Sequence, residues 1–117
     1  MINFAEMSLQ CRQYWKLDIS NRILSDGANQ IHLTNIEVVI VKSMLLKEER
    51  VISRAELVSS IGREPDLYRG LGMTLSRLQT KFKKSAEGRH LFRAVRNRGY
   101  CLTQTIHING EPSREFT

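Results

Sequence analysis

The stretches LYRGLGMTLSRLQTKFKK, residues 67–84, and LFRAVRNRGYCLT, residues 91–103, decide how this chain folds. In the first, apolar residues recur at the spacing of one buried side of a helix: Leu71, Leu75, Leu78 and Phe82. In the second, two apolar runs flank Asn97-Arg98-Gly99, where Asn and Gly tolerate a positive φ and favour a turn. The sequence therefore predicts a helix over residues 67–84 followed by a β-hairpin.

The positive charge of the chain is concentrated in these two stretches. Residues 69–98 hold nine Lys or Arg side chains and a single acid, Glu87, which gives a local net charge of +8. Residues 1–68 hold eight bases and nine acids, and residues 99–117 hold one base and two acids. A surface with such a segment attracts a polyanion.

Opposite its apolar stripe, the predicted helix carries a basic and polar face with one Met. Its members are Arg69, Met73, Ser76, Arg77, Thr80 and Lys84, with Lys81 and Lys83 on the flanks. Such a face suits the major groove of DNA, where Arg bonds to guanine and an apolar tip contacts thymine methyl groups. A helix that is merely solvated would carry the same charges, so the face alone leaves both interpretations open.

The hairpin that follows presents Arg96 and Arg98 at its tip. A hairpin that only closes a sheet does not need two arginines there. A helix for the major groove beside a cationic hairpin that can reach a phosphate or the minor groove makes a winged helix-turn-helix. The hairpin therefore favours DNA binding over a solvated basic helix.

Upstream of residue 34 the sequence predicts a small antiparallel sheet. Residues 15–19 alternate apolar and polar side chains, as a half-buried strand does, and residues 22–24 and 30–33 are two further strand-like runs. Asp26-Gly27 between the last two is a strong turn signal. We expect three short strands in sequence order.

Two helices should lie between this sheet and the basic helix. Thr34 and Ser53 are each followed three residues later by Glu, the pattern of a capping box. The first helix is expected to reach about Lys47 and to bury Ile36, Val39, Ile40 and Met44. The second should end at Gly62, and Val51-Ile52 between them either pairs with a strand or seals the core. The predicted fold class is α+β: a winged helix-turn-helix with an N-terminal antiparallel β-sheet, a three-helix core and a C-terminal β-hairpin wing.

Length and composition are typical of one soluble domain. The chain has 117 residues, enough for one adequate core. Its longest apolar run, residues 36–46, is interrupted by two charges, and the N-terminus lacks the pattern of a secretory signal. We expect a cytoplasmic, DNA-binding domain over residues 14–104, an extension or linker over residues 1–13, and a tail over residues 105–117. From residue 106 this tail is expected to be frayed or to extend the last strand briefly.

Residue types that carry catalysis or bind metals are scattered. Cys11 and Cys101 are too few and too distant for a metal knuckle or a disulfide framework, and His32, His90 and His107 have no ligand-type neighbours at suitable spacing. No Ser or Cys nucleophile stands beside a His in the sequence. The sequence thus argues against an enzyme and predicts no metal and no cofactor.

Several short motifs, in order between Trp15 and Leu102, resemble the OmpR/PhoB-type winged-helix effector domain. They are Leu33-Thr34 with Glu37, Val51-Ile52-Ser53-Arg54 with Glu56-Leu57, Leu75-Ser76-Arg77-Leu78, and Val95-Arg96 with Gly99-Tyr100. The resemblance implies a four-stranded N-terminal sheet, a three-helix core, a wing, and binding of promoter DNA as tandem or paired protomers. The wing is also similar to that of the ToxR-like branch.

The resemblance implies a role for individual residues. Arg77 matches a base-contacting Arg, Met73 an apolar base contact and Arg69 a phosphate contact. The residues expected to contact DNA are Arg69, Met73, Ser76, Arg77, Thr80, Lys81, Lys84, Arg96, Asn97 and Arg98. Ser53 and Arg54, at a helix start that offers free N–H groups, are candidates for a phosphate contact.

The sequence departs from the family in three places. Gly70 and Gly72 lie within the predicted helix, where each costs about 1 kcal/mol relative to Ala. Gln79 and Thr80 stand where basic residues are common, which should reduce phosphate contacts. Ile61-Gly62 replaces an aromatic residue before a short loop, so contact with RNA polymerase stays open.

Two questions about function remain open from the sequence. A phosphoacceptor domain does not fit in 117 residues, so the chain is the effector part of a longer regulator or a stand-alone regulator. A third possibility is the ToxR-like branch, in which the same domain lies at the N-terminus of a membrane protein. The alternative to DNA binding is a winged-helix module that binds another protein through Met73 and its neighbours. RNA is a less suitable partner, because the basic segment lacks interleaved exposed aromatic residues.

Overall fold

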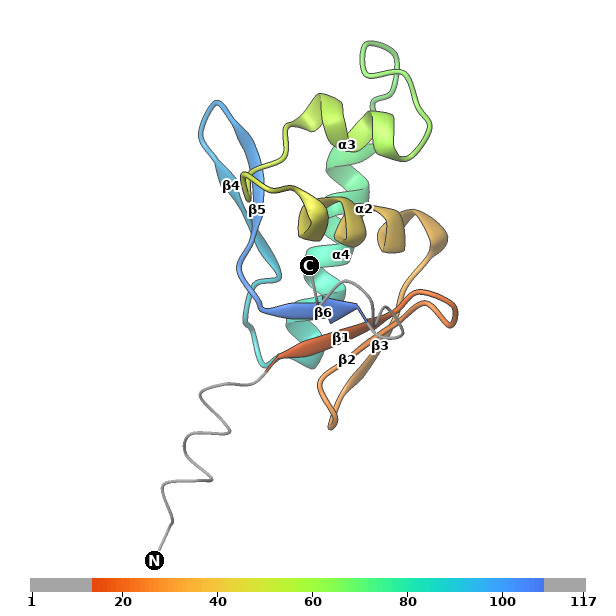
Figure 1. The fold of residues 1–117 in the computed structure, drawn as a ribbon, viewed down its shortest axis with the longest axis vertical. Coiled ribbons are helices and arrows are strands. Elements are labelled where there is room, and N and C mark those ends of the chain that lie inside the picture. Colours follow the sequence, from red (N-terminus) through yellow and green to blue (C-terminus); the bar gives the residue numbers. More distant parts are fainter. Residues whose placement is uncertain (1–13, 109–117) are drawn as a thin grey trace, which may run out of the picture.

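A computed structural model describes residues 14–108 and shows the α+β winged-helix architecture (Figure 1). The elements are β1 (Trp15–Asp18), β2 (Ile23–Ser25), β3 (Gln30–His32), α2 (Asn35–Leu46), α3 (Arg54–Ser60), α4 (Leu71–Ser85), β4 (Phe92–Val95), β5 (Gly99–Leu102) and β6 (Ile106–Ile108). The predicted fold class is confirmed. The extension over residues 1–13, Cys11 within it, and the tail beyond residue 108 lie outside the described residues.

The larger sheet has four strands in the order β3-β2-β1-β6. The strands β1, β2 and β3 pair antiparallel in sequence order, as predicted. β6 pairs parallel with β1, and places Ile106 beside Trp15 and Ile108 beside Leu17. The fourth strand therefore comes from the segment that the sequence predicted as a tail, either frayed or a brief extension of the last strand. A parallel partner is reached through a long connection, so no local turn signal announces it.

The helices α2 and α3 begin where the capping boxes predict. Thr34 Oγ1 accepts from the Glu37 N–H, and the Glu37 carboxylate accepts from the Thr34 N–H; Ser53 and Glu56 repeat the arrangement. The predicted buried face of α2 is partly wrong. Ile40 and Met44 are buried as expected, but Val38 and Val41 are buried in place of Ile36 and Val39. Because α2 is apolar at most positions, periodicity does not single out one face.

The start of α4 differs from the prediction by four residues. The helix begins at Leu71, and the segment before it is a turn in which the Leu67 and Tyr68 N–H groups bond to the Glu64 carbonyl at 3.0 and 2.9 Å. Gly70 is the N-cap and lies outside the helix, where a Cβ would come within 2.7 Å of the Tyr68 hydroxyl. The expectation of two glycines inside the helix is therefore wrong: only Gly72 is internal.

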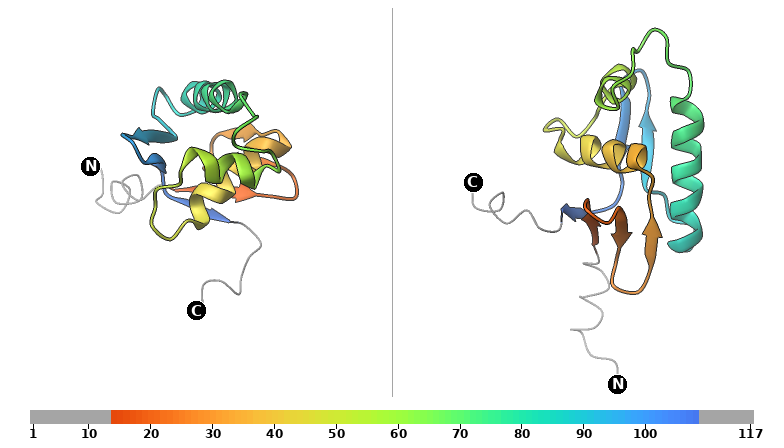
Figure 2. Two further views of the ribbon diagram at one scale, coloured as in Figure 1. Left: turned by 90° about the horizontal axis from the view of Figure 1, so that it is seen from above. Right: turned by 90° about the vertical axis from the view of Figure 1, so that its right-hand side faces the viewer.

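The core lies where α4 meets the sheet, the other helices and the hairpin. α4 runs along much of the domain, with the β4–β5 hairpin beside it and the four-stranded sheet at one end (Figures 1 and 2). The predicted α4 stripe is buried throughout: Leu71, Leu75, Leu78 and Phe82. The Phe82 ring packs against the Trp15 ring of β1, with 4.7 Å between the centroids. The buried stripe thereby fixes which side of α4 faces outward.

Candidate nucleic-acid interface

The exposed side of α4 carries most of the predicted contact residues. Met73 is 61% exposed, and four other residues on the same side of the helix are also exposed: Ser76, Arg77, Thr80 and Lys84. We call these five residues the outer face of α4. Arg69 is exposed in the loop just before the helix, and Lys83 is exposed on its flank. An Arg, two hydroxyls and an apolar tip thus project from a helix whose other side is locked in the core.

The hairpin formed by β4 and β5, the wing, stands next to α4 (Figure 2). Its tip consists of Arg96, Asn97 and Arg98, and all three residues are exposed. Asn97 adopts φ 62°, and the Arg98 N–H closes the turn onto the Val95 carbonyl at 2.9 Å. Two guanidinium groups are therefore presented at the end of a short, ordered hairpin.

The wing is tied to the segment between α2 and α3. Ile52 and Tyr100 exchange two backbone hydrogen bonds of 2.9 Å, and Ile52 is buried. Val51-Ile52 therefore does both of the things that the sequence left open. Gly99 has φ 139° and lies so close to Ile52 that a Cβ would collide with the Ile52 carbonyl oxygen. Only glycine fits there.

Gln79 links the wing to α4 and is a contact that the sequence did not reveal. Its side-chain Nε2 donates to the Phe92 carbonyl at 2.8 Å, and its Oε1 accepts from the Leu91 N–H at 2.7 Å. A groove of about 400 Å³ lies between the two elements, with Ser76, Thr80 and Lys83 among the lining residues from α4 and Tyr100 among those from the wing. Polar and basic side chains of the outer face and its flank therefore line one side of the groove between α4 and the wing.

Lys81 does not join the outer face. Its ammonium group donates to Glu37 Oε1 at 2.7 Å and to the His32 carbonyl at 2.9 Å. Glu37 is only 4% exposed, and the same Oε1 accepts the Thr34 N–H. Lys81 thus neutralises a buried carboxylate and ties α4 to the start of α2, although the sequence placed it among the DNA contacts.

Ser53 and Arg54 are likewise engaged within the protein. The Ser53 hydroxyl caps α3 by accepting the Glu56 N–H at 3.1 Å. The Arg54 guanidinium donates to the Tyr68 carbonyl at 2.9 Å and to the Pro65 carbonyl at 3.4 Å. Arg54 therefore holds the loop that leads into α4, a role that no local sequence signal indicates.

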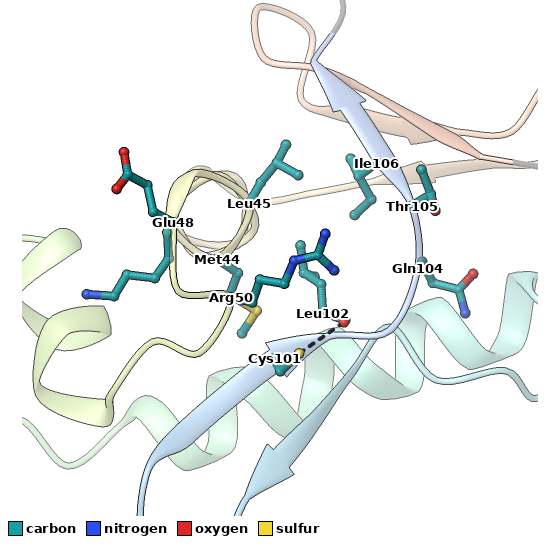
Figure 3. Close-up of a pocket in the computed structure, with 10 residues that line it drawn as sticks. Met44, Leu45, Glu48, Arg50, Cys101, Leu102, Gln104, Thr105 and Ile106 are labelled. Atoms are coloured by element: carbon teal, nitrogen blue, oxygen red, sulfur yellow. Dashed lines mark hydrogen bonds between the residues drawn. The ribbon is translucent and has the colours of Figure 1, made fainter.

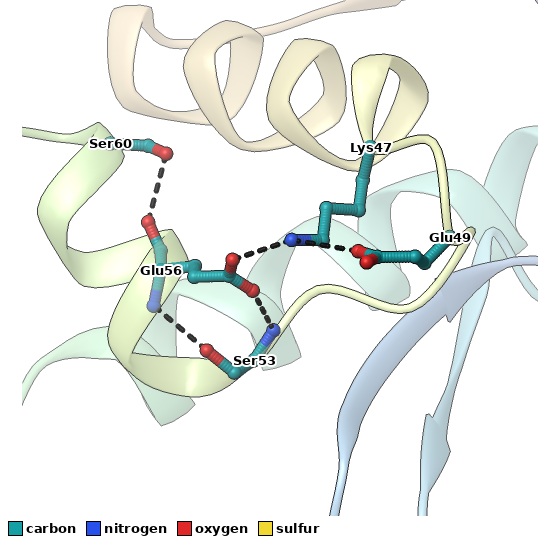
Figure 4. A network of polar contacts seen from close by, with 5 residues as sticks. All are labelled: Lys47, Glu49, Ser53, Glu56 and Ser60. Atoms are coloured by element: carbon teal, nitrogen blue, oxygen red, sulfur yellow. Dashed lines mark hydrogen bonds and ion pairs between the residues drawn. The ribbon is translucent and has the colours of Figure 1, made fainter.

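A surface ion-pair network lies beside the start of α3 (Figure 4). Lys47 Nζ lies 2.6 Å from the Glu56 carboxylate and 3.1 Å from that of Glu49. The hydrogen bond from Lys47 lowers the pKa of Glu56, and the bond to Glu56 raises the pKa of Lys47. Lys47, Glu49 and Glu56 also line a shallow hollow on the surface, and Arg98 of the wing tip lines the same hollow. The network braces the turn between α2 and α3, next to the point where the wing is attached.

The pocket drawn in Figure 3 lies away from the outer face of α4. It has a volume of about 290 Å³ and is formed by the end of α2, the turn after it, and the segment from β5 to β6. Cys101 lies on its wall, with the thiol directed to the Leu102 carbonyl at 3.3 Å. None of its lining residues is charged apart from Lys47, Glu48 and Arg50.

Two other kinds of feature are absent from residues 14–108. That part of the chain contains no group of three or more His, Cys, Asp or Glu residues placed to hold a metal ion. It also contains no helix that is both long and apolar enough to cross a membrane. Most of the contact residues predicted from the sequence lie on the outer face of α4 and at the wing tip.

The sequence is similar to those of known regulatory proteins. The family described as "Transcriptional regulatory protein, C terminal" matches residues 28–102. The regulatory protein VirG of Rhizobium rhizogenes is 27% identical over 108 residues, which make up 91% of this chain and 42% of VirG. The chain therefore spans less than half the length of this relative.

The fold is similar to those of solved DNA-binding domains. The DNA-binding domain of RstA from Klebsiella pneumoniae, solved in complex with the RstA box, gives a TM-score of 0.59 at 20% identity, covering 74% of this chain and 87% of that one. The DNA-binding domain of CpxR from E. coli gives a TM-score of 0.60 at 23% identity, covering 74% and 86%. At these identities the similarity establishes the fold.

Proposed function

The chain belongs to this family of C-terminal domains of transcriptional regulatory proteins, the OmpR/PhoB-type winged-helix domains, and we propose that it regulates transcription by binding specific sequences of double-stranded DNA. The observation that carries the proposal is the outer face of α4, where Met73 and Arg77 project opposite a fully buried stripe. A helix so anchored presents a fixed surface, and its width suits the major groove.

In the proposed complex, α4 enters the major groove with the Arg77 and Met73 side chains directed toward the base edges. A guanidinium can donate two hydrogen bonds to O6 and N7 of one guanine, and this pairing discriminates between bases by about 1–3 kcal/mol. The Met73 side chain can contact a thymine methyl group, while Ser76 and Thr80 can bond to a base edge or a phosphate. Arg77 and Met73 therefore supply specificity.

The wing and the remaining cations contact the DNA backbone. Arg96, Asn97 and Arg98 lie at the end of the wing, which suits a neighbouring phosphate or the narrower minor groove. Arg69, Lys83 and Lys84 are exposed near the outer face and can neutralise phosphates. If about six phosphates are neutralised, the logarithm of affinity should fall with the logarithm of salt concentration with a slope of about −5.

The first experiment is a selection of bound duplexes from a random pool, followed by anisotropy titrations at two salt concentrations. We expect Arg77→Ala to weaken the selected duplex by about 1–3 kcal/mol and to relax the preference at one position. Lys84→Ala should weaken all duplexes alike and reduce the salt slope by about one. Lys42→Ala, which removes an exposed cation from α2, is the matched control and should change neither.

Two outcomes would contradict the proposal. Equal losses on selected and random duplexes for both Arg77→Ala and Lys84→Ala would mean that α4 does not read bases. A chain that binds no duplex at low salt, but retains another regulator in a pull-down, would support the protein-interaction module instead. A direct repeat among the selected sequences would further support tandem binding of two protomers.

The same proposal covers the protein as a whole. We propose that the chain acts in the bacterial cytoplasm and by binding, without catalysis or a cofactor, as the DNA-binding part of a regulator. VirG is more than twice as long as the matched region, so the proposal concerns only the part of such a regulator that this similarity covers.

A further inference from the structure

We propose that Gln79 is a positioning residue, which fixes the wing on α4 and so sets where the wing tip meets DNA when Arg77 occupies the major groove. This inference rests on the proposed function and deepens it. Gln79 lies two residues after Arg77 on α4, but it points toward the base of β4 rather than outward. The sequence predicts that Gln79 only replaces a phosphate-binding cation, but in the structure it links α4 to the wing.

Both the nitrogen and the oxygen of the Gln79 side-chain amide form hydrogen bonds with the start of the wing. Its Nε2 donates to the Phe92 carbonyl at 2.8 Å, and its Oε1 accepts from the Leu91 N–H at 2.7 Å and more weakly from the Phe92 N–H at 3.4 Å. A carbonyl and two N–H groups admit only one orientation of the amide, since its oxygen must face the N–H groups. A side chain that matches donor to acceptor in this way specifies the position of the strand, which an apolar contact would not do.

The second strand of the wing is held separately. On β5, Tyr100 pairs with Ile52 from the segment between α2 and α3, and Gly99 permits the close approach. Gln79 holds β4 from the other side, through α4. Because β5 is tied to the segment between α2 and α3 and β4 is tied to α4, the wing has one position relative to the outer face of α4.

This position matters because DNA fixes the spacing between the grooves. Arg77 can contact a base in the major groove while Arg98 contacts a phosphate or the minor groove only if the distance between α4 and the wing tip equals the distance between these two places on the DNA. If the bonds of Gln79 are removed, β4 keeps its pairing with β5 but loses its direct polar link to α4. We therefore expect both contacts to form still, but at a cost in free energy for reordering the wing.

The positioning role can be tested first without DNA. Gln79→Met keeps the length of the side chain and removes its hydrogen bonds. The matched control is Gln30→Met, because Gln30 is exposed on β3, away from the wing. We expect amide hydrogen exchange of Leu91, followed by NMR, to accelerate about tenfold in Gln79→Met and to remain unchanged in Gln30→Met. Unchanged exchange at Leu91 in Gln79→Met would overturn the inference.

The consequence for DNA is tested by a double-mutant cycle. Gln79→Met should weaken binding to the selected duplex about three- to tenfold, the effect expected for one or two lost hydrogen bonds. In a chain that already carries Arg96→Ala and Arg98→Ala, the same substitution should have less than about a twofold effect.

The possible results separate this inference from the proposed function. An equal loss with and without the wing arginines would mean that Gln79 acts only on stability, and would overturn the positioning role. If the unmodified chain binds no duplex, the proposed function fails and the DNA part of the inference fails with it. The exchange measurement would still decide whether Gln79 fixes the wing on α4.

Discussion

Lys81 and Lys84 lie three residues apart on α4 and put the same charge to different uses. Lys84 is exposed on the outer face, where nothing within residues 14–108 neutralises it. The Lys81 ammonium lies 2.7 Å from the buried carboxylate of Glu37. A basic segment of a sequence is therefore not a uniform surface: part of its charge binds the helix to the rest of the domain, and only the remainder is available for a polyanion.

The same contrast appears at the start of α4. The guanidinium of Arg54 bonds to two loop carbonyls, whereas that of Arg69, in the same loop, is exposed. The engaged cations, Lys81 and Arg54, hold α4 at both ends of its length. These contacts, together with the buried apolar stripe of α4, fix the helix that carries the exposed cations.

The largest effect should come from breaking the inward pair. We expect Lys81→Met to lower the free energy of unfolding by about 2–4 kcal/mol, because it leaves the buried Glu37 carboxylate without its cationic partner. Lys84→Met should change it by less than about 0.5 kcal/mol. Urea denaturation followed by circular dichroism measures both.

A second variant tests the cause of that loss. Glu37→Gln keeps an acceptor for the Thr34 N–H but carries no charge. In combination with Lys81→Met it should recover part of the lost stability, since no ionised group is then buried. If Lys81→Met and Lys84→Met proved equally stable, the division between engaged and exposed cations would be wrong.

A smaller effect is expected at Arg54. Arg54→Lys cannot reach both the Tyr68 and Pro65 carbonyls, because a single ammonium lacks the fork of the guanidinium. We expect a loss of about 0.5–1.5 kcal/mol in stability and faster amide exchange at Leu67 and Tyr68. Arg69→Lys is the matched control, since Arg69 lies in the same loop and its side chain is exposed. Identical exchange in the two variants would show that Arg54 does not order the loop.

Local signals explain which parts of the fold could be predicted from the sequence. The starts of α2 and α3 were predicted because a capping box lies within four residues. The start of α4 was not, because Gly70 provides no side-chain cap and Arg54, which orders the preceding loop, lies 14 residues from Tyr68 in sequence. β6 was missed for a similar reason, since its partner β1 lies at the other end of the domain.

In the candidate interface, too, features with a local sequence signal could be predicted and features that depend on a distant partner could not. The periodicity of α4 was sufficient to place Met73 and Arg77 outward, because the buried stripe is regular. It could not show that Lys81 turns inward, because its partner Glu37 lies 44 residues away. Gln79 occupies a position where the sequence predicts a lost phosphate contact, and only its bonds to Leu91 and Phe92 reveal its role. Helical periodicity identifies exposure, but a polar side chain on a flank is assigned only by its tertiary partner.

The smallest effect is expected from the Lys47 network, where the charges are engaged but exposed. Because the bond from Lys47 lowers the pKa of Glu56 below its ordinary value of 4.5, folding favours the ionised carboxylate. The resulting stabilisation is present above pH 4.5 and is lost as the pH falls through the pKa of the folded state. Lys47→Met should therefore flatten the dependence of unfolding free energy on pH below 4.5, whereas Lys42→Met should not. The difference should shrink in 1 M salt, unlike the effect of Lys81→Met, because solvent ions screen exposed pairs more than buried ones.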